Sequence, residues 1–279
     1  MNYGINIRYF SRDIGMPRAA ALVAGAGFTL LDYTPPIFED GWEATMREDM
    51  RTFSACGLTV HQTHAPFDRY GQYGKERHRL YLARCAEATA ILGAELMVAH
   101  GDEFDFAERE FSPEAALAYN HALYLPYIEA GERDGYRVAF ETVFEDWNRR
   151  RYTSAADELL ALVSSFGEGR ADICWDFGHS NIAFRADAPA VIRRFGSLIT
   201  CTHLHDNAGV QDSHQMPLTG DIKWRETMAA FREIGYSGAF CVEYAHGHIP
   251  DGMAEDYIRL TYRMAAHLAG YIEEKEKDA

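Results

Sequence analysis

The sequence predicts a single (β/α)8 barrel, the TIM-barrel fold, on three observations. Short β-rich segments alternate with helical segments eight times along the chain. A glycine often stands between a helical segment and the β-rich segment that follows it. The chain has 279 residues, and a barrel of this kind takes roughly 250 residues. A doubly wound open sheet, which has the same alternation, is the alternative.

The expected strands are short and mostly apolar. Glycines at 27, 57, 93, 135 and 235 precede five of them, and glycine adopts the left-handed backbone that commonly ends a helix. The strands are expected at residues 3–9, 28–33, 58–64, 95–100, 136–142, 171–176, 199–205 and 238–244.

The expected helices lie between and after these strands. Ser112 followed by Pro113 predicts a capped start for one helix, and Thr153 or Ser154 predicts the cap of the next. The helices are expected at residues 14–25, 42–56, 75–92, 113–134, 154–166, 187–195, 224–234 and 254–270. Because no Pro/Gly/Ser linker or low-complexity stretch separates these units, we expect one domain over residues 1–279.

Composition favours a soluble, acidic, cytoplasmic globular protein. The chain has 27 Lys and Arg against 42 Asp and Glu, a formal net charge of −15, so a nucleic-acid partner is not expected. We expect no membrane association, because no apolar run approaches roughly 18 residues. The first residues, MNYGINIRYF, lack a basic-then-apolar leader, so no secretory signal is expected. Five cysteines without CxxC pairing indicate reduced thiols.

Known nucleotide-binding and nucleophile motifs are missing from the sequence. No GxGxxG follows the first expected strand, and neither a P-loop nor a GxSxG elbow occurs. We therefore expect no nucleotide cofactor.

Acidic and histidine side chains stand where six consecutive expected strands end. In a TIM barrel the active site lies at the carboxyl ends of the strands. Many carboxylates and imidazoles at one end of the barrel cost free energy through desolvation and charge repulsion unless a cation compensates them. These groups are also normal ligands of Mn, Mg, Co or Zn. We therefore expect one divalent metal at this rim. The residues are His64, His100, Glu141, Asp176, His179, His203, His205 and Glu243, joined by Asp212 and His214 from the loop after strand seven.

Side-chain alternation predicts which residues fill the barrel interior. If Asp176, His205 and Glu243 point inward, then Cys174, Cys201, His203 and Cys241 share their direction. Ile173, Trp175, Leu204, Phe240 and Val242 then face the outer helices. On this pattern the three cysteines are small interior residues, and His203 is an interior histidine rather than a metal ligand.

The motifs along the whole chain resemble those of the xylose-isomerase-like superfamily, which includes ketose 3-epimerases, sugar-phosphate isomerases and endonuclease IV. The most specific stretches are His203-Leu-His-Asp-Asn207, Asp212-Ser-His214, Gly220-Asp-Ile-Lys-Trp224 and Asp176-Phe-Gly-His179. The epimerase branch implies one divalent metal held by Glu141, Asp176, His205 and Glu243, with His179 contacting substrate. Its usual arginine six residues beyond the metal histidine is Gln211 in this chain.

The endonuclease IV branch implies three zinc ions and is the alternative. It would add His64, His100, His179, Asp212 and His214 as metal ligands. The Thr-Val-Phe-Glu-Asp-Trp run after Glu141 and the Ser-Asn-Ile-Ala-Phe run after His179 differ from that branch. These departures and the acidic charge favour an isomerase or epimerase. A metal-dependent dehydratase of a cyclic keto-polyol is a third possibility, and a metal-binding sensor without turnover is a further class.

The resemblance also implies a mechanism. Glu141 and Glu243 act as the acid/base pair that moves a proton next to a carbonyl, and the metal stabilises the enediolate. His64, His100, His179 and His214 then bind the hydroxyls of a sugar-like substrate. Aromatic residues in the expected loops are candidates to cover its apolar face: Phe10, Tyr33, Phe67, Phe144, Trp147 and Phe184. No clear phosphate-binding cluster is visible. The three arginines at 149–151 could serve as one, but a solvated basic turn is expected there. Family habit suggests a homodimer or homotetramer.

Overall fold

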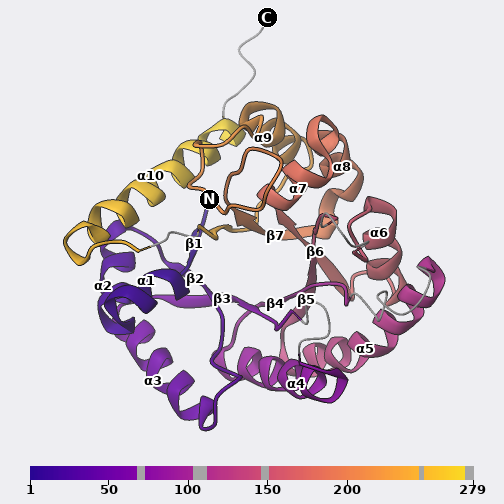
Figure 1. The fold of residues 1–279 in the computed structure, drawn as a ribbon, viewed down its shortest axis with the longest axis horizontal. Helices are drawn as coiled ribbons and strands as arrows, with labels where there is room; N and C mark the ends of the chain where they lie inside the picture. Colours follow the sequence, from indigo (N-terminus) through magenta and orange to yellow (C-terminus); the bar gives the residue numbers. More distant parts are fainter. Residues whose placement is uncertain (68–72, 103–111, 146–150, 245–247, 274–279) are drawn as a thin grey trace, which may run out of the picture.

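A computed structural model shows eight parallel strands that close into a barrel in sequence order, with the last strand beside the first (Figure 1). The structure describes residues 1–67, 73–102, 112–145, 151–244 and 248–273. The predicted (β/α)8 fold is confirmed, and the open sheet is wrong. The strands are β1 (Tyr3–Asn6), β2 (Leu30–Tyr33), β3 (Thr59–His64), β4 (Leu96–Ala99), β5 (Arg137–Glu141), β6 (Ala171–Asp176), β7 (Ile199–Leu204) and β8 (Phe240–Val242).

An outer ring of helices surrounds the strands, as Figure 1 shows. The ring consists of α2 (Met16–Ala26), α3 (Trp42–Ala55), α4 (Lys75–Leu92), α5 (Pro113–Asp134), α6 (Ala156–Ser165), α8 (Ala188–Phe195), α9 (Trp224–Glu233) and α10 (Ala254–Glu273). Each corresponds to one of the eight expected helices. Two short helices, α1 (Arg8–Ile14) and α7 (Phe177–Ala183), follow β1 and β6 and were not expected. Short 3-10 turns, η2 (Arg185–Asp187), η3 (Gly196–Leu198) and η4 (Asp251–Met253), complete the described elements.

Two local predictions about element ends were wrong. The first strand was expected to run to residue 9, but it ends at Asn6, whose Oδ1 accepts a hydrogen bond from Arg8 N at 3.1 Å and so starts α1. The helix α6 begins after Ala155 without a side-chain cap. Neither expected side chain caps the helix. Ser154 Oγ donates to Arg151 O instead, and at Thr153 the backbone N–H makes the contact by donating to Glu158 Oε2.

The cap predicted for α5 is confirmed. Ser112 Oγ accepts a hydrogen bond from Ala115 N at 3.2 Å, and Pro113 occupies the first turn. The backbone N–H groups of a first helical turn have no partner within the helix, so this contact stabilises the start of α5.

The predicted alternation of inward and outward side chains is also confirmed. Cys174 and Cys201 form a buried interior cluster with Leu96, Val98 and Ala139. Their neighbours Ile173, Trp175, Leu204, Phe240 and Val242 belong to the separate core between strands and helices. All five cysteines are free thiols. Among the described residues, no helix is both long and apolar enough to span a bilayer.

Candidate active site

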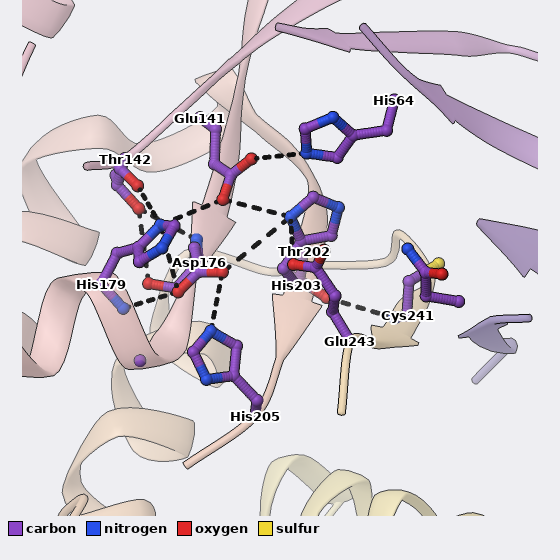
Figure 2. A network of polar contacts seen from close by, with 12 residues as sticks. His64, Glu141, Thr142, Asp176, His179, Thr202, His203, His205, Cys241 and Glu243 are labelled. Carbon is purple, nitrogen blue, oxygen red and sulfur yellow. Dashed lines mark hydrogen bonds and ion pairs between the residues drawn. The ribbon is translucent and has the colours of Figure 1, made fainter. Parts of the chain in front are cut away.

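A buried glutamate lies at the centre of the barrel mouth. Glu141, at the end of β5, is 1% exposed. His64 Nε2 and His100 Nε2 lie 3.3 and 3.0 Å from its Oε2. His179 Nδ1 and His203 Nδ1 lie 3.0 and 3.2 Å from its Oε1 (Figure 2). Histidines from β3, from the end of β4, from α7 and from β7 thus converge on one carboxylate.

Two further carboxylates approach the same histidine of β7. His203 Nδ1 lies 3.3 Å from Glu243 Oε2 and 3.9 Å from Asp176 Oδ2. The ligand atoms of Glu141, Asp176, His203 and Glu243 all lie within 4.8 Å of one another, and we call these four residues the central group. His203 was expected to be an interior histidine, and it is fully buried, but it faces the carboxylates directly.

A second cluster adjoins the central group. The ligand atoms of His179, His205, Asp212 and His214 also lie within 4.8 Å of one another, and we call them the rim group. Asp212 Oδ2 lies 3.2 Å from His179 Nε2 and 3.1 Å from His214 Nε2. His205 Nε2 lies 3.0 Å from Asp176 Oδ2, so Asp176 joins the two groups.

The turn from β6 into α7 brings Asp176 and His179 together. Asp176 is the N-cap of α7, and its Oδ1 accepts a hydrogen bond from His179 N at 2.6 Å. An N-cap side chain satisfies an N–H near the start of a helix, which explains the three-residue spacing of these two residues. Gly178, directly before His179, leaves space for the His205 ring, because a Cβ there would overlap the imidazole.

Backbone carbonyls orient three of the histidines. His64 Nδ1 faces Ala65 O at 2.9 Å, His179 Nδ1 faces Thr142 O at 3.0 Å, and His214 Nδ1 faces Glu243 O at 2.9 Å. A carbonyl accepts only from a protonated ring nitrogen, so each Nδ1 carries hydrogen. Each Nε2 is thereby turned toward Glu141 or Asp212, which is the orientation of a metal-binding imidazole.

The buried charges in the mouth depend on one another. Burial raises the pKa of Glu141, but the charges of His203 and His100 outweigh it and hold this pKa well below its usual value. Burial lowers the pKa of His203, but Glu243 and Glu141 raise it well above its usual value. Burial lowers the pKa of His100 to about 4. These directions favour an anionic Glu141 beside a protonated His203, and a metal ion would compete with that proton.

The donor atoms of both groups fit a divalent cation. In the described part of the chain, no hydrogen bond of normal geometry reaches either oxygen of Glu141, either nitrogen of His203, or His205 Nδ1. Buried polar atoms normally have a partner, and those that lack one often surround an ion or water. Carboxylate oxygens together with imidazole nitrogens suit Mn, Co or Zn, and carboxylates alone suit Mg.

A cavity of about 520 Å³ opens above these residues. Its walls include Tyr9, Phe67, Phe144, Arg151 and Gln211, together with Glu141, Glu243 and four histidines. This volume lies in the usual range for small-molecule sites. All the expected site residues (Glu141, Asp176, His205, Glu243, His64, His100, His179, Asp212 and His214) lie in or beneath this mouth.

The sequence prediction missed two residues of the site. Asp32 is the last but one residue of β2 and is fully buried, with Oδ2 3.0 Å from His203 Nε2. An acid at the end of a further strand was the available signal. The second missed residue is Arg151. A solvated turn was expected at 149–151, and this expectation was wrong for Arg151, which lines the cavity and is only 4% exposed. It is buried because the rings of Phe67 and Phe144 pack against its guanidinium. The other two arginines of that turn, and Trp147, lie outside the described residues.

The fold and the converging ligands define a (β/α)8 barrel with a candidate metal centre at the carboxyl ends of its strands. A family model described as "Xylose isomerase-like TIM barrel" matches residues 20–264. The chain therefore belongs to the xylose isomerase-like TIM-barrel family.

Two curated proteins are similar to this chain in sequence. Uncharacterized protein y4fM of Sinorhizobium fredii is 25% identical over 256 residues, covering 80% of this chain and 79% of that protein. Uncharacterized protein MJ1311 of Methanocaldococcus jannaschii is 27% identical over 187 residues, covering 64% of this chain and 62% of that protein.

Two solved structures have the same fold. A D-tagatose 3-epimerase-like protein superposes with a TM-score of 0.74 and 20% identity, covering 98% of this chain and all of the other. A D-psicose 3-epimerase superposes with a TM-score of 0.75 and 16% identity, covering 97% of this chain and all of the other.

Proposed function

We propose that the protein is a metal-dependent sugar isomerase or epimerase that moves a proton on a carbon next to a carbonyl. The observation that carries this proposal is the pair Glu141 and Glu243, which come from opposite parts of the barrel. Their oxygens lie 3.2 and 3.3 Å from the same atom, His203 Nδ1. Both carboxylates also line the cavity, where a substrate reaches them. The likeness to solved epimerases supports the same reaction class.

The two carboxylates have complementary roles in this mechanism. One takes the proton from the carbon next to the carbonyl, and the other returns a proton to the opposite face or to the adjacent carbon. The low pKa of Glu141 keeps this carboxylate anionic, which suits the first role. His203 Nδ1 lies close to an oxygen of each carboxylate. His64, His100, His179 and His214 line the same cavity and donate or accept hydrogen bonds at substrate hydroxyls.

Three carboxylates and one strand-seven histidine would hold the metal ion. Glu141, Asp176 and Glu243 belong both to the ligand set that the epimerase resemblance implies and to the central group. The two sets differ in the histidine. The resemblance implies His205, whereas the central group contains His203. A divalent ion bound there would polarise the carbonyl and stabilise the negative charge that develops on its oxygen.

Incubation in D2O tests the proposed reaction. The protein, purified without chelator, is incubated with a panel of ketoses, sugar phosphates and keto-polyols, and its metal content is measured by elemental mass spectrometry. We expect about one Mn, Mg, Co or Zn ion per chain. We also expect at least one substrate to incorporate deuterium or to be converted into a different sugar. Loss of water from a cyclic keto-polyol would assign a dehydratase, and neither product nor deuterium from any member would contradict the proposal.

The rim group favours one second candidate, a multi-zinc phosphodiester hydrolase. Its four ligand atoms, and the further set of His64, His100 and Glu141, offer space for more than one cation. Metal ions close together commonly activate water for phosphate-ester cleavage. Two or three zinc ions per chain and cleavage of a duplex with an abasic site would support this candidate over the isomerase.

A further inference from the structure

One arginine stands in the wall of the active-site cavity between two aromatic rings. The Arg151 guanidinium carbon lies 4.7 Å from the centre of the Phe67 ring and 5.5 Å from that of Phe144. Arg151 is 4% exposed. Such stacking favours a guanidinium, whose charge interacts with the ring faces.

The two phenylalanines tie the arginine to the catalytic region. The Phe67 ring centre lies 4.5 Å from that of His100, and the Phe144 ring centre lies 5.3 Å from that of His179. The backbone of Arg151 is also held in place, because Ser154 Oγ donates a hydrogen bond to Arg151 O at 2.8 Å. The guanidinium therefore has a defined position relative to the carboxylates that perform the proposed reaction.

The charge of Arg151 is unusual in this cavity. Among the described residues that line the cavity, it is the one Arg or Lys, beside Glu141, Asp212 and Glu243. Neutral hydroxyls do not require a permanent cation, whereas an anionic group gains strongly from one.

We propose that Arg151 binds an anionic substituent of the substrate, a phosphate or a carboxylate. This inference rests on the proposed isomerase or epimerase function and narrows its substrate class to acidic sugars or sugar phosphates. The anionic group lies against the wall formed by Phe67, Arg151 and Phe144, while the carbonyl end lies over Glu141 and Glu243. Planar N–H pairs of arginine match both phosphate and carboxylate oxygens.

A matched set of three ligands tests the proposal. D-fructose, D-fructose 6-phosphate and D-fructuronate differ at C6, which bears a hydroxyl, a phosphate or a carboxylate. Binding is measured by calorimetry and by the shift in Tm of the metal-loaded protein, and turnover is followed by deuterium incorporation. We expect at least one anionic ligand to bind about 10- to 100-fold more tightly than fructose, the range typical of charge-assisted hydrogen bonds.

Three variants assign that preference to a residue. Arg151→Met should bind all three ligands within about threefold of one another, because it keeps apolar contact with the rings but loses the charge. Arg151→Lys should keep part of the preference, since it retains the charge without the planar donors. Arg193→Met is the matched control. Arg193 is an exposed arginine on α8 that pairs with Glu233 and does not line the cavity, so its loss should not affect the preference.

The outcomes separate this inference from the proposed function. A preference for phosphate or for carboxylate identifies which anion is bound. Equal binding of all three ligands, no binding of any, or a preference that survives in Arg151→Met and Arg151→Lys overturns the inference even if a neutral ketose is epimerised. Arg151-dependent anion binding without deuterium exchange or product supports the anion site and counts against the isomerase.

Discussion

Asp32 and His203 form a fully buried pair at the base of the active-site mouth. Asp32 Oδ2 lies 3.0 Å from His203 Nε2, and both side chains have no exposed surface. Asn6 Nδ2 donates to the same Asp32 oxygen at 3.4 Å. A carboxylate at one ring nitrogen orients the ring and makes the other nitrogen a better ligand. His203 Nδ1 is thus directed toward Glu141 and Glu243.

Asp32→Asn should therefore weaken metal binding without changing any candidate ligand. The amide keeps the shape of the side chain but removes the charge that orients His203. We expect affinity for the metal to fall about 10- to 100-fold. Competition with a fluorescent chelator measures the affinity, and circular dichroism checks the fold. An unchanged affinity would show that Asp32 has no influence on the metal site.

Glu141→Gln and Glu243→Gln test the acid/base pair. Glutamine keeps an oxygen for the metal but cannot take a proton, so kcat should fall about 10²- to 10⁴-fold in each variant. Metal content is measured in parallel to separate lost chemistry from lost metal. Glu132→Gln, on the exposed side of α5, is the control, because this residue pairs with Arg170 far from the mouth. Near-normal turnover by metal-loaded Glu141→Gln and Glu243→Gln would refute their assigned roles.

The two histidines of the β7 region make different predictions for the metal. If the central group holds the ion, His203→Ala should lose most of it, and His205→Ala should retain it. The resemblance to epimerases predicts the opposite result. Elemental analysis of both variants decides, with the Tm of each reported because His203 is fully buried.

The sequence predicted the barrel and most of its site because strand ends are visible as local patterns. Alternation in 171–176 and 199–205 placed Asp176 and Cys174 on the interior side, as the structure has them. Contacts between side chains from different strands and loops could not be predicted from such local patterns. The proximity of His203 to Glu141 and the enclosure of Arg151 depend on which side chains meet across the mouth. The strand twist and loop paths that bring them together leave no periodic signal.

Gly178→Ala should disturb His205 more than an ordinary helical substitution would. An added Cβ would overlap the imidazole of His205, and overpacking of this kind costs about 1–3 kcal/mol. Gly25→Ala is the matched control within α2, since a Cβ there meets no atom within 4 Å. It should stabilise the protein by about 0.5–1 kcal/mol. Urea unfolding of both variants measures the difference, and equal effects would contradict the predicted crowding.

Asp172→Asn should change how stability depends on pH. Asp172 lies at the opposite end of β6 from the site, 2.9 Å from Arg137 Nε, and burial raises its pKa to about 6 despite Arg137. The native state therefore binds this proton more tightly than the unfolded chain, whose aspartate has a pKa of about 4. Stability from this group is fully present below pH 4 and is lost as the pH rises through 6.

Asparagine mimics the protonated form, so Asp172→Asn should match the parent at pH 4. It should be more stable at pH 7 by up to about 3 kcal/mol, the value of a two-unit shift. Urea unfolding at both pH values measures the difference, with Asp157→Asn as an exposed control on α6. A difference that does not grow between pH 4 and 7 would mean that the Arg137 pair fully offsets the burial of Asp172. In that case this end of the barrel gains nothing from losing the charge.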